Sequence, residues 1–290
     1  MSGALDGLVA LLDLETLEEN LFRGRSPDVT QQRVFGGQVA GQALVAAGRT
    51  LDSVERPAHS LHAYFLRPGD TSVPIIYEVH RLRDGRSFTT RRVDAIQHGR
   101  PIFHMQASFQ VVEDGVEHFR PMPDVPRPDE LPTTEERLGD KASMLKSWIR
   151  TERPIELRYV TMPSGMTGEV GPPAQQVWFR ANGTPPPDQM LQRCLVTYVS
   201  DMTLLDISMG PHAHSWFEPR FQVASLDHAM WFHHDIDASQ WMLYDQYSPF
   251  AGGARGLSQG YIYAADGRLV TTVTQEGLIR PLRHMSSQGG

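Results

Sequence analysis

The two halves of the chain present the same order of predicted elements, and this duplication constrains the fold more than any other feature. Each half has a helix-like segment followed by strand-like segments joined by short turns. Three pairs of landmarks have nearly the same separation: Gln38 and Asp201, Ser60 and Ser225, and Gly99 and Gly267. Self-similarity at a fixed offset is the signature of a repeated structural unit. We therefore predict an α+β fold of two tandem units, with two unrelated α+β halves as the alternative.

The first half is predicted to begin with an amphipathic helix over residues 4–22. A second helix, over 39–48, is rich in Gly and Ala and ends at Gly48. Because each Gly costs a helix about 1 kcal/mol relative to Ala, we expect this helix to be buried with a sheet packed closely against it. Antiparallel strands follow at 60–66, 73–82, 87–96 and 101–112, with turns at Asp84-Gly85 and His98-Gly99.

The second half is predicted to contain a long amphipathic helix over 191–205, because its apolar residues recur at helical spacing. Its predicted strands are 225–233, 241–247, 256–264 and 269–278, the last two joined by a turn at Asp266-Gly267. Residues 113–135 carry several prolines among acidic residues, which is typical of an extended linker, and a short helix near 135–150 follows. The resulting division is an N-terminal unit over 1–115, a proline-rich linker over 116–150 and a C-terminal unit over 151–290.

The composition narrows the class of partners and the compartment. The formal net charge is −7 and the pI is about 5.9, which argues against a general nucleic-acid binder. The single cysteine, Cys194, excludes an intramolecular disulfide framework and a cysteine-based zinc site, and it indicates a reducing compartment. The apolar stretch 5–14 is interrupted by Asp6 and Asp13, so we expect neither a signal peptide nor a membrane span. The expected location is the cytoplasm.

Several motifs have both a functional and a structural interpretation. Residues 256–260 read Gly-Leu-Ser-Gln-Gly, the pattern of a hydrolase nucleophile elbow, but the next residues predict a strand and hairpin rather than the required helix. We interpret this motif as a chance match. His228, His233 and His234 cluster without the spacing of metal ligands, so no metal site is predicted and they are taken as packing or substrate contacts. Cys194 is interpreted as a small core residue.

Three polar residues occupy positions where apolar ones are expected or lie beside such positions. Asp201 is predicted to lie in the middle of the second-half helix, at the edge of its apolar stripe, where an aspartate is locally unfavourable. Ser225 opens an aromatic-rich strand, and Gln275 lies within the last strand. Taken one at a time, none of these positions indicates catalysis.

Four segments resemble the acyl-CoA thioesterase II (TesB-type) family. They are FGGQVAGQAL at 35–44, HAYFLRPGD at 62–70, DHAMWFH at 227–233 and QEG at 275–277. The resemblance runs in the same order over almost the whole chain, from about residue 8 to residue 280. It implies a double hotdog fold, in which each of two tandem repeats is a long central helix wrapped by an antiparallel β-sheet. That expectation agrees with the duplication.

The resemblance also carries over a catalytic trio by position: Asp201, Ser225 and Gln275. Many family members have Thr where this chain has Ser225, so the hydroxyl is kept and the stiffening methyl group is lost. All three residues lie in the C-terminal repeat. The expected first-half counterparts are Gln38, Ser60 and Ala107. Because these supply no carboxylate at the Asp position and no amide at the Gln position, the resemblance implies that the N-terminal repeat is a non-catalytic copy.

The implied reaction is hydrolysis of fatty acyl-CoA to a free fatty acid and CoA. The trio would position a water that attacks the thioester directly, with Asp201 as the base and without a covalent intermediate. No cofactor is expected. Because CoA carries phosphates, an acidic protein must gather positive charge locally. The candidate substrate-binding residues are Arg255, Arg86 and His228.

Two other functions stay open at this point. One is hotdog-fold enoyl-CoA hydratase or dehydratase chemistry, which Gln275 disfavours because such sites use a His with an acidic residue. The other is a non-catalytic acyl-CoA-binding module. Exposed sheet edges predict that the protomers assemble further, into a homodimer or homotetramer. The expected partner is the acyl-CoA substrate. Neither nucleic-acid binding nor stable membrane insertion is expected.

Overall fold

The computed structural model describes residues 3–27, 33–52, 56–139, 152–212, 215 and 220–282. The elements of the first half are α1 (Ala4–Leu12), β1 (Glu15–Glu18), β2 (Leu21–Gly24), α2 (Gly36–Gly48), β3 (Ala58–Phe65), β4 (Ile75–Asp84), β5 (Phe88–Gln97) and β6 (Arg100–Gln110). Two short helices follow, η1 (Pro128–Glu130) and α3 (Thr134–Leu138).

The second half begins with β7 (Ile155–Tyr159), α5 (Ser164–Thr167), β8 (Ala174–Ala181) and α6 (Gln189–Ser200). It continues with η3 (Asp206–His212), β9 (Phe221–Ser225), β10 (Asp227–Phe232), β11 (Met242–Gly252), β12 (Arg255–Ala264) and β13 (Leu269–Pro281). None of the helices in the described part of the chain is long and apolar enough to cross a membrane.

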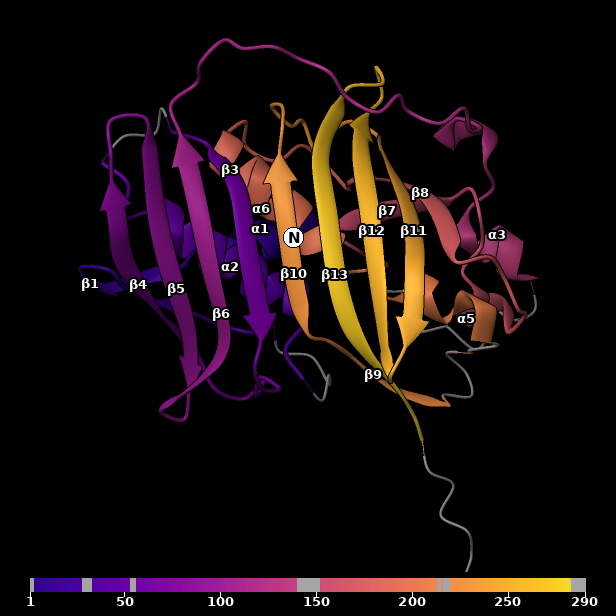
Figure 1. Ribbon diagram of the computed structural model, residues 1–290, viewed down its shortest axis with the longest axis horizontal. Helices are drawn as coiled ribbons and strands as arrows, with labels where there is room; N and C mark the ends of the chain where they lie inside the picture. Colours follow the sequence, from indigo (N-terminus) through magenta and orange to yellow (C-terminus); the bar gives the residue numbers. More distant parts are fainter. Residues whose placement is uncertain are drawn as a thin grey trace, which may run out of the picture.

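One antiparallel sheet runs through both halves and shows the duplication directly (Figure 1). Its order is β1-β2-β4-β5-β6-β3-β10-β13-β12-β11-β8-β7, with β9 pairing with β13 off this path. The order β4-β5-β6-β3 is mirrored by β11-β12-β13-β10, and the two halves join where β3 pairs with β10. The prediction of a tandem α+β repeat is confirmed, and the two helices wrapped by one sheet form the double hotdog.

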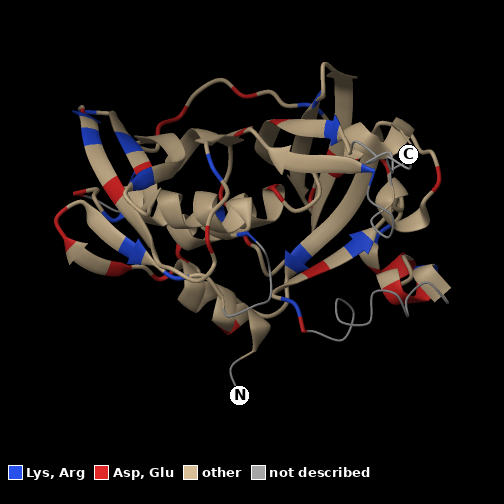
Figure 2. Cartoon of the chain, turned by 90° about the horizontal axis from the view of Figure 1, so that it is seen from below, with Lys and Arg blue, Asp and Glu red and all other residues tan. Residues whose placement is uncertain are grey.

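The two central helices pack antiparallel to each other, and the small residues of α2 make this possible. A Cβ atom at Gly37 would lie 2.3 Å from the backbone oxygen of Tyr198, and one at Gly41 would lie 3.3 Å from that of Cys194. Every residue from Gly37 to Ala47 is buried. The prediction of a buried, glycine-rich helix under a sheet is confirmed, and α2 contains none of the Lys, Arg, Asp or Glu residues that are coloured in Figure 2.

Each repeat has an extra hairpin before its central helix, and the sequence analysis missed both. The helix predicted over 4–22 ends at Leu12, and β1 and β2 form a hairpin that turns at Asn20, whose φ is 60°. The helical prediction beyond residue 12 relied on Leu17, which is exposed rather than packed. The second hairpin, β7 with β8, occupies the same place beside β11 that β2 occupies beside β4.

The segment between the repeats is extended, as its prolines predict. Residues 111–127 contain no helix or strand and run across one end of the sheet toward α3 (Figure 1). The indole Nε1 of Trp178 donates to the carbonyl oxygen of Pro126 at 2.9 Å, which fixes this segment to β8. Of the helix predicted near 135–150, α3 covers 134–138, and residues 140–151 lie outside the described part of the chain.

Candidate active site

Three elements of the second half bring Asp201, Ser225 and Gln275 together. Asp201 is the residue that caps the C-terminus of α6, so its predicted position in the middle of a helix is wrong. The helix ends at Ser200, and residues 201–205 form turns. Ser225 is the last residue of β9 and lies opposite Gly277 of β13, two positions beyond Gln275. This register brings the serine hydroxyl and the glutamine amide to the same end of α6.

One carboxylate oxygen accepts hydrogen bonds from both partners. The Ser225 hydroxyl donates to Asp201 Oδ1 at 2.9 Å, and the Gln275 Nε2 donates to the same oxygen at 2.5 Å. The backbone N–H of Gly37, in the first turn of α2, also donates to the carboxylate. The sequence analysis placed the whole trio in the second half and missed this contribution from the first. The adjacent glycines Gly36 and Gly37 were the sequence feature that could have indicated a close backbone contact here.

Burial dominates the titration of Asp201. Desolvation raises its pKa from 3.8 to about 6, and the hydrogen bonds from Gln275, Ser225 and Gly37 oppose that rise because they stabilise the charged form. A carboxylate with a pKa near 6 is ionised at neutral pH and is a stronger proton acceptor than an ordinary aspartate. Both properties are needed in a general base.

A cavity of about 470 Å³ opens beside this carboxylate and draws on both repeats. Its wall includes Phe35, Gly36, Phe65, Asp201, Met202 and Ser225, and Arg33 and Arg67 also line it. Gly36 is required here, because a Cβ atom at that position would lie 2.5 Å from Asp201 Oδ2. The backbone of Gly36 therefore passes directly against the second carboxylate oxygen, which no larger residue would allow.

The end of α6 is held from behind by a buried polar network. His228 Nε2 is 2.8 Å from the hydroxyl of Ser200, and the hydroxyl of Tyr244 donates to the Ser200 carbonyl oxygen at 3.1 Å. Burial lowers the pKa of His228 to about 4, so this histidine is neutral near pH 7. His228 is 1% exposed and does not line the cavity, so the structure gives it a packing role in place of the predicted substrate contact.

The two arginines predicted to bind substrate lie away from this cavity. Arg255 is at the hairpin between β11 and β12, where its Nε is 2.9 Å from a carboxylate oxygen of Glu276. Arg86 lies in the turn between β4 and β5. Neither residue lines the cavity, whereas Arg33 and Arg67 do. Nothing in the sequence pattern distinguished Arg33 and Arg67 from the other arginines of the chain.

The motif at 256–260 is part of strand β12, as interpreted from the sequence. Ser258 is fully buried and lies opposite Gln275 in the ladder between β12 and β13, so it is not on a sharp turn. Cys194 is fully buried within α6, and burial raises the pKa of its thiol far above the ordinary range. A thiol that stays protonated is a packing residue and not a nucleophile.

The structure revises the first-half counterparts of the trio. Asp201 caps α6, and the residue that caps α2 in the same way is Arg49, so the equivalence with Gln38 is wrong. Ser225 lies opposite the residue two beyond Gln275, and in the first half Ala58 lies opposite Phe109, two beyond Ala107. The counterpart of Ser225 is thus Ala58 rather than Ser60, and Ala107 keeps its place.

Comparison with known proteins agrees with this architecture. The family model for acyl-CoA thioesterases matches residues 144–278, and the model for the acyl-CoA thioesterase N-terminal domain matches residues 25–110. Acyl-CoA thioesterase 2 of Haemophilus influenzae is 42% identical over 97% of this chain and 99% of its own length. The chain belongs to the acyl-CoA thioesterase family.

Other members of the acyl-CoA thioesterase family are similar over nearly their full length. Human acyl-coenzyme A thioesterase 8 is 41% identical over 94% of this chain and 88% of its own. The crystal structure of acyl-CoA thioesterase II TesB2 from Mycobacterium marinum is 43% identical, with a TM-score of 0.79 over 95% of this chain and 98% of that one. A hot dog protein from Alicyclobacillus acidocaldarius, 18% identical over 98% of this chain and 100% of its own, superposes with a TM-score of 0.79 and supports the fold alone.

Proposed function

We propose that this thioesterase hydrolyses fatty acyl-CoA to a free fatty acid and CoA, with Asp201, Ser225 and Gln275 as its catalytic residues. The observation that carries the proposal is the shared acceptor: Ser225 and Gln275 donate to one oxygen of Asp201 beside a cavity. Two such donors hold the carboxylate in one orientation. In the proposal, the carboxylate acts on a water in the cavity that Asp201 lines.

In the proposed reaction the carboxylate of Asp201 accepts a proton from that water while the water oxygen attacks the thioester carbonyl carbon. The tetrahedral intermediate collapses by breaking the carbon–sulfur bond, and the CoA thiolate leaves and takes up a proton. No bond forms between enzyme and acyl group. A thioester carbonyl is a good electrophile, so a positioned water suffices, and general-base catalysis of this kind contributes about 10²–10⁴-fold.

Two features of the site support this division of roles. Gln275 is fully buried and does not line the cavity, so in the proposal it acts by orienting the Asp201 carboxylate through its hydrogen bond. The first turn of α2 faces the same cavity, and its backbone N–H groups are the proposed donors to the developing oxyanion. In the proposal, Arg33 and Arg67 attract the anionic CoA portion at the cavity wall.

The test is release of CoA thiol from a series of acyl-CoA esters, followed with a thiol reagent. Asp201→Asn is expected to lower kcat by at least about 100-fold, because the amide cannot accept the proton. The matched control is Asp188→Asn at the start of α6, where Asn caps a helix as well as Asp does, so its kcat stays within about twofold.

The same assay separates the alternatives. Loss of enoyl absorbance without thiol release would indicate hydratase chemistry, and tight acyl-CoA binding without turnover would indicate a binding module. Near-normal kcat in a folded Asp201→Asn protein would remove Asp201 from the mechanism. For the proposed assembly of protomers, light scattering of the purified protein gives the mass directly.

A further inference from the structure

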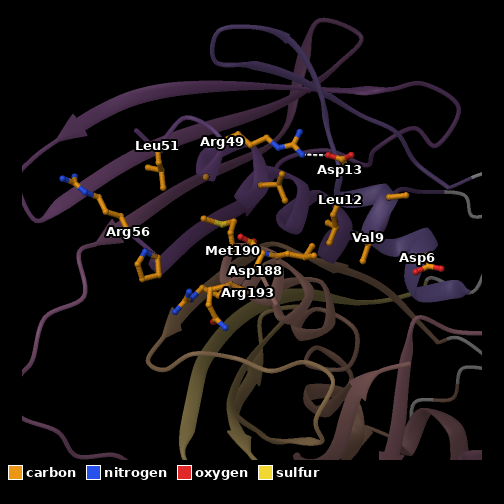
Figure 3. A pocket seen from close by; sticks show the side chains of 16 residues that line it. Asp6, Val9, Leu12, Asp13, Arg49, Leu51, Arg56, Asp188, Met190 and Arg193 are labelled. Carbon is orange, nitrogen blue, oxygen red and sulfur yellow. Dashed lines mark hydrogen bonds and ion pairs between the residues drawn. The ribbon is translucent and has the colours of Figure 1, made fainter. Parts of the chain in front are cut away.

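A second cavity lies at the opposite ends of the two central helices, where the C-terminus of α2 meets the N-terminus of α6 beneath α1 (Figure 3). Its volume is about 730 Å³, which is larger than the cavity beside Asp201 and within the usual range of ligand sites. Most of its wall is apolar. The apolar side chains that matter here are Val9, Leu12, Val45, Leu51, Met190 and Leu191.

One side chain in this wall is an unexplained buried cation. Arg193 is 4% exposed, and its Nη2 is 3.2 Å from a carboxylate oxygen of Asp235. Its Nε and Nη1 are buried and have no hydrogen-bond partner among the described residues. Because Asp235 is 76% exposed, the pair is screened by water and offsets little of the cost of burying a guanidinium. A buried donor without an acceptor is expensive to keep, so its presence in this wall requires an explanation.

The other charged residues are distributed unevenly around the cavity. Arg56 donates to the carbonyl oxygen of Gly85 and the hydroxyl of Thr89, which are neutral partners. In contrast, Arg49 is paired with Asp13, and Asp188 accepts from the backbone of Leu191. In Figure 3, Arg56 and Arg193 lie toward one side of the cavity and Asp6 toward the other. The cavity therefore has Arg56 and Arg193 at one end, with the Asp188 carboxylate near Arg193, and apolar walls beyond them.

We propose that this cavity binds a fatty carboxylate, with its head group at Arg193 and Arg56 and its chain along the apolar wall. An amphiphilic anion matches both halves of the lining, because its carboxylate can pair with the arginines that line one end and its chain removes apolar surface from water. The site is separate from the one around Asp201. The proposal does not depend on the proposed reaction, since binding is measured without turnover.

The experiment is calorimetric titration of the full chain with decanoate, and with decanol as the uncharged analogue. Arg193→Met keeps the length and apolar stem of the side chain but removes the donors, and it is expected to weaken one class of decanoate sites at least tenfold. Arg158→Met, which removes a partly buried, ion-paired arginine on β7, is the control and keeps wild-type binding. Val9→Trp, which fills the cavity from α1, is expected to abolish the same class of sites while Arg193 is intact.

A structural role for Arg193 predicts different results. If the guanidinium serves only to stabilise the fold, Arg193→Met lowers the melting temperature; the proposal predicts an equal or higher one, because an unsatisfied buried charge is removed. Equal decanoate affinity in Arg193→Met and Arg158→Met would overturn the proposal. So would decanol binding as tightly as decanoate, or undiminished binding in Val9→Trp. Because Asp201 and its partners are untouched in every variant, thiol release reports on the proposed reaction independently.

Discussion

The two ends of the α2–α6 helix pair have the same backbone plan and opposite chemistry. At one end the C-terminus of α6 carries Asp201 against the first turn of α2; at the other the C-terminus of α2 carries Arg49 near the first turn of α6. A cation suits a helix C-terminus, whereas a carboxylate there is unfavourable in its own helix. Asp201 is tolerated because the partner helix presents the backbone N–H of Gly37, in its first turn, to the carboxylate.

The two ends also differ in the side chains that surround the residue at the helix C-terminus. The Asp201 end has two side-chain donors aimed at the carboxylate, and the equivalent positions at the Arg49 end are Ala58 and Ala107. Arg49 instead donates to the carbonyl oxygen of Leu14 and to Asp13, which fixes α1 against the pair. One end therefore keeps a partly buried acid with a raised pKa, and the other end keeps a satisfied ion pair.

The largest expected effect is on stability, and it appears at the Asp201 end only. The pKa of Asp201 is raised from 3.8 to about 6 by folding, so its stabilising contribution is complete below pH 4 and is lost as the pH rises through 6. Asp201→Asn is therefore expected to be more stable than wild type at pH 8 by about 3 kcal/mol, an upper figure from two pKa units. Urea unfolding at pH 8 and at pH 4 measures the difference, which shrinks toward zero at the lower pH.

The matched change at the other end has the opposite sign. Arg49→Met removes an ion pair and a backbone hydrogen bond, so it is expected to destabilise the protein by about 1 kcal/mol or less, since the pair is partly exposed.

An Asp201→Asn protein that is less stable than wild type at pH 8 would contradict the first prediction. It would show that the ionised carboxylate stabilises the fold.

The next effect concerns Gln275. Gln275→Ala removes one charge-assisted donor, worth about 2 kcal/mol, and kcat is expected to fall about thirtyfold. Steady-state thiol release gives kcat, and Ser108→Ala, on the equivalent strand β6, is the control that stays within about twofold. Equal loss in both variants would indicate a general effect of weakening the sheet.

The smallest effect is expected at Ser225, whose bond to Asp201 is the longer of the two. Ser225→Ala is expected to reduce kcat about tenfold, in line with loss of a hydrogen bond to a charged group. Because the hydroxyl stabilises the carboxylate, its loss also raises the pKa of Asp201 and moves the acidic limb of the pH profile to higher pH. Ser225→Thr, which keeps the hydroxyl, is the rescue variant. A limb that moves to lower pH would contradict the assigned hydrogen bond.

Much of the fold was predictable because short stretches of sequence are enough to indicate strands and turns. The strands after each helix, and the turns at His98-Gly99 and Asp266-Gly267, follow from alternation and from residues that accept positive φ. The hairpin β1–β2 was missed because Leu17 mimics helical spacing, although its side chain is exposed. The end of α6 was misplaced because Met202 and Leu205 continue the apolar spacing through turns.

The site was predictable from the sequence only in part. Asp201, Ser225 and Gln275 came from a family resemblance, because no local pattern marks residues that meet through strand register. The roles of Gly36 and Gly37 depend on the approach of a helix from the other repeat, which one sequence does not reveal. The proposed ligand site in the second cavity was not predictable, because Arg193 lies within α6 and the apolar stripe of this helix does not indicate a buried cation.

The most direct test of the account is the dependence of kcat/KM on pH for the wild-type enzyme. If the Asp201 carboxylate is the base, thiol release rises with pH through an apparent pKa of about 6 and reaches a plateau above it, and this limb is absent from the residual activity of Asp201→Asn. A profile that is flat from pH 4.5 to 8, or a limb near pH 6 that persists in Asp201→Asn, would contradict it.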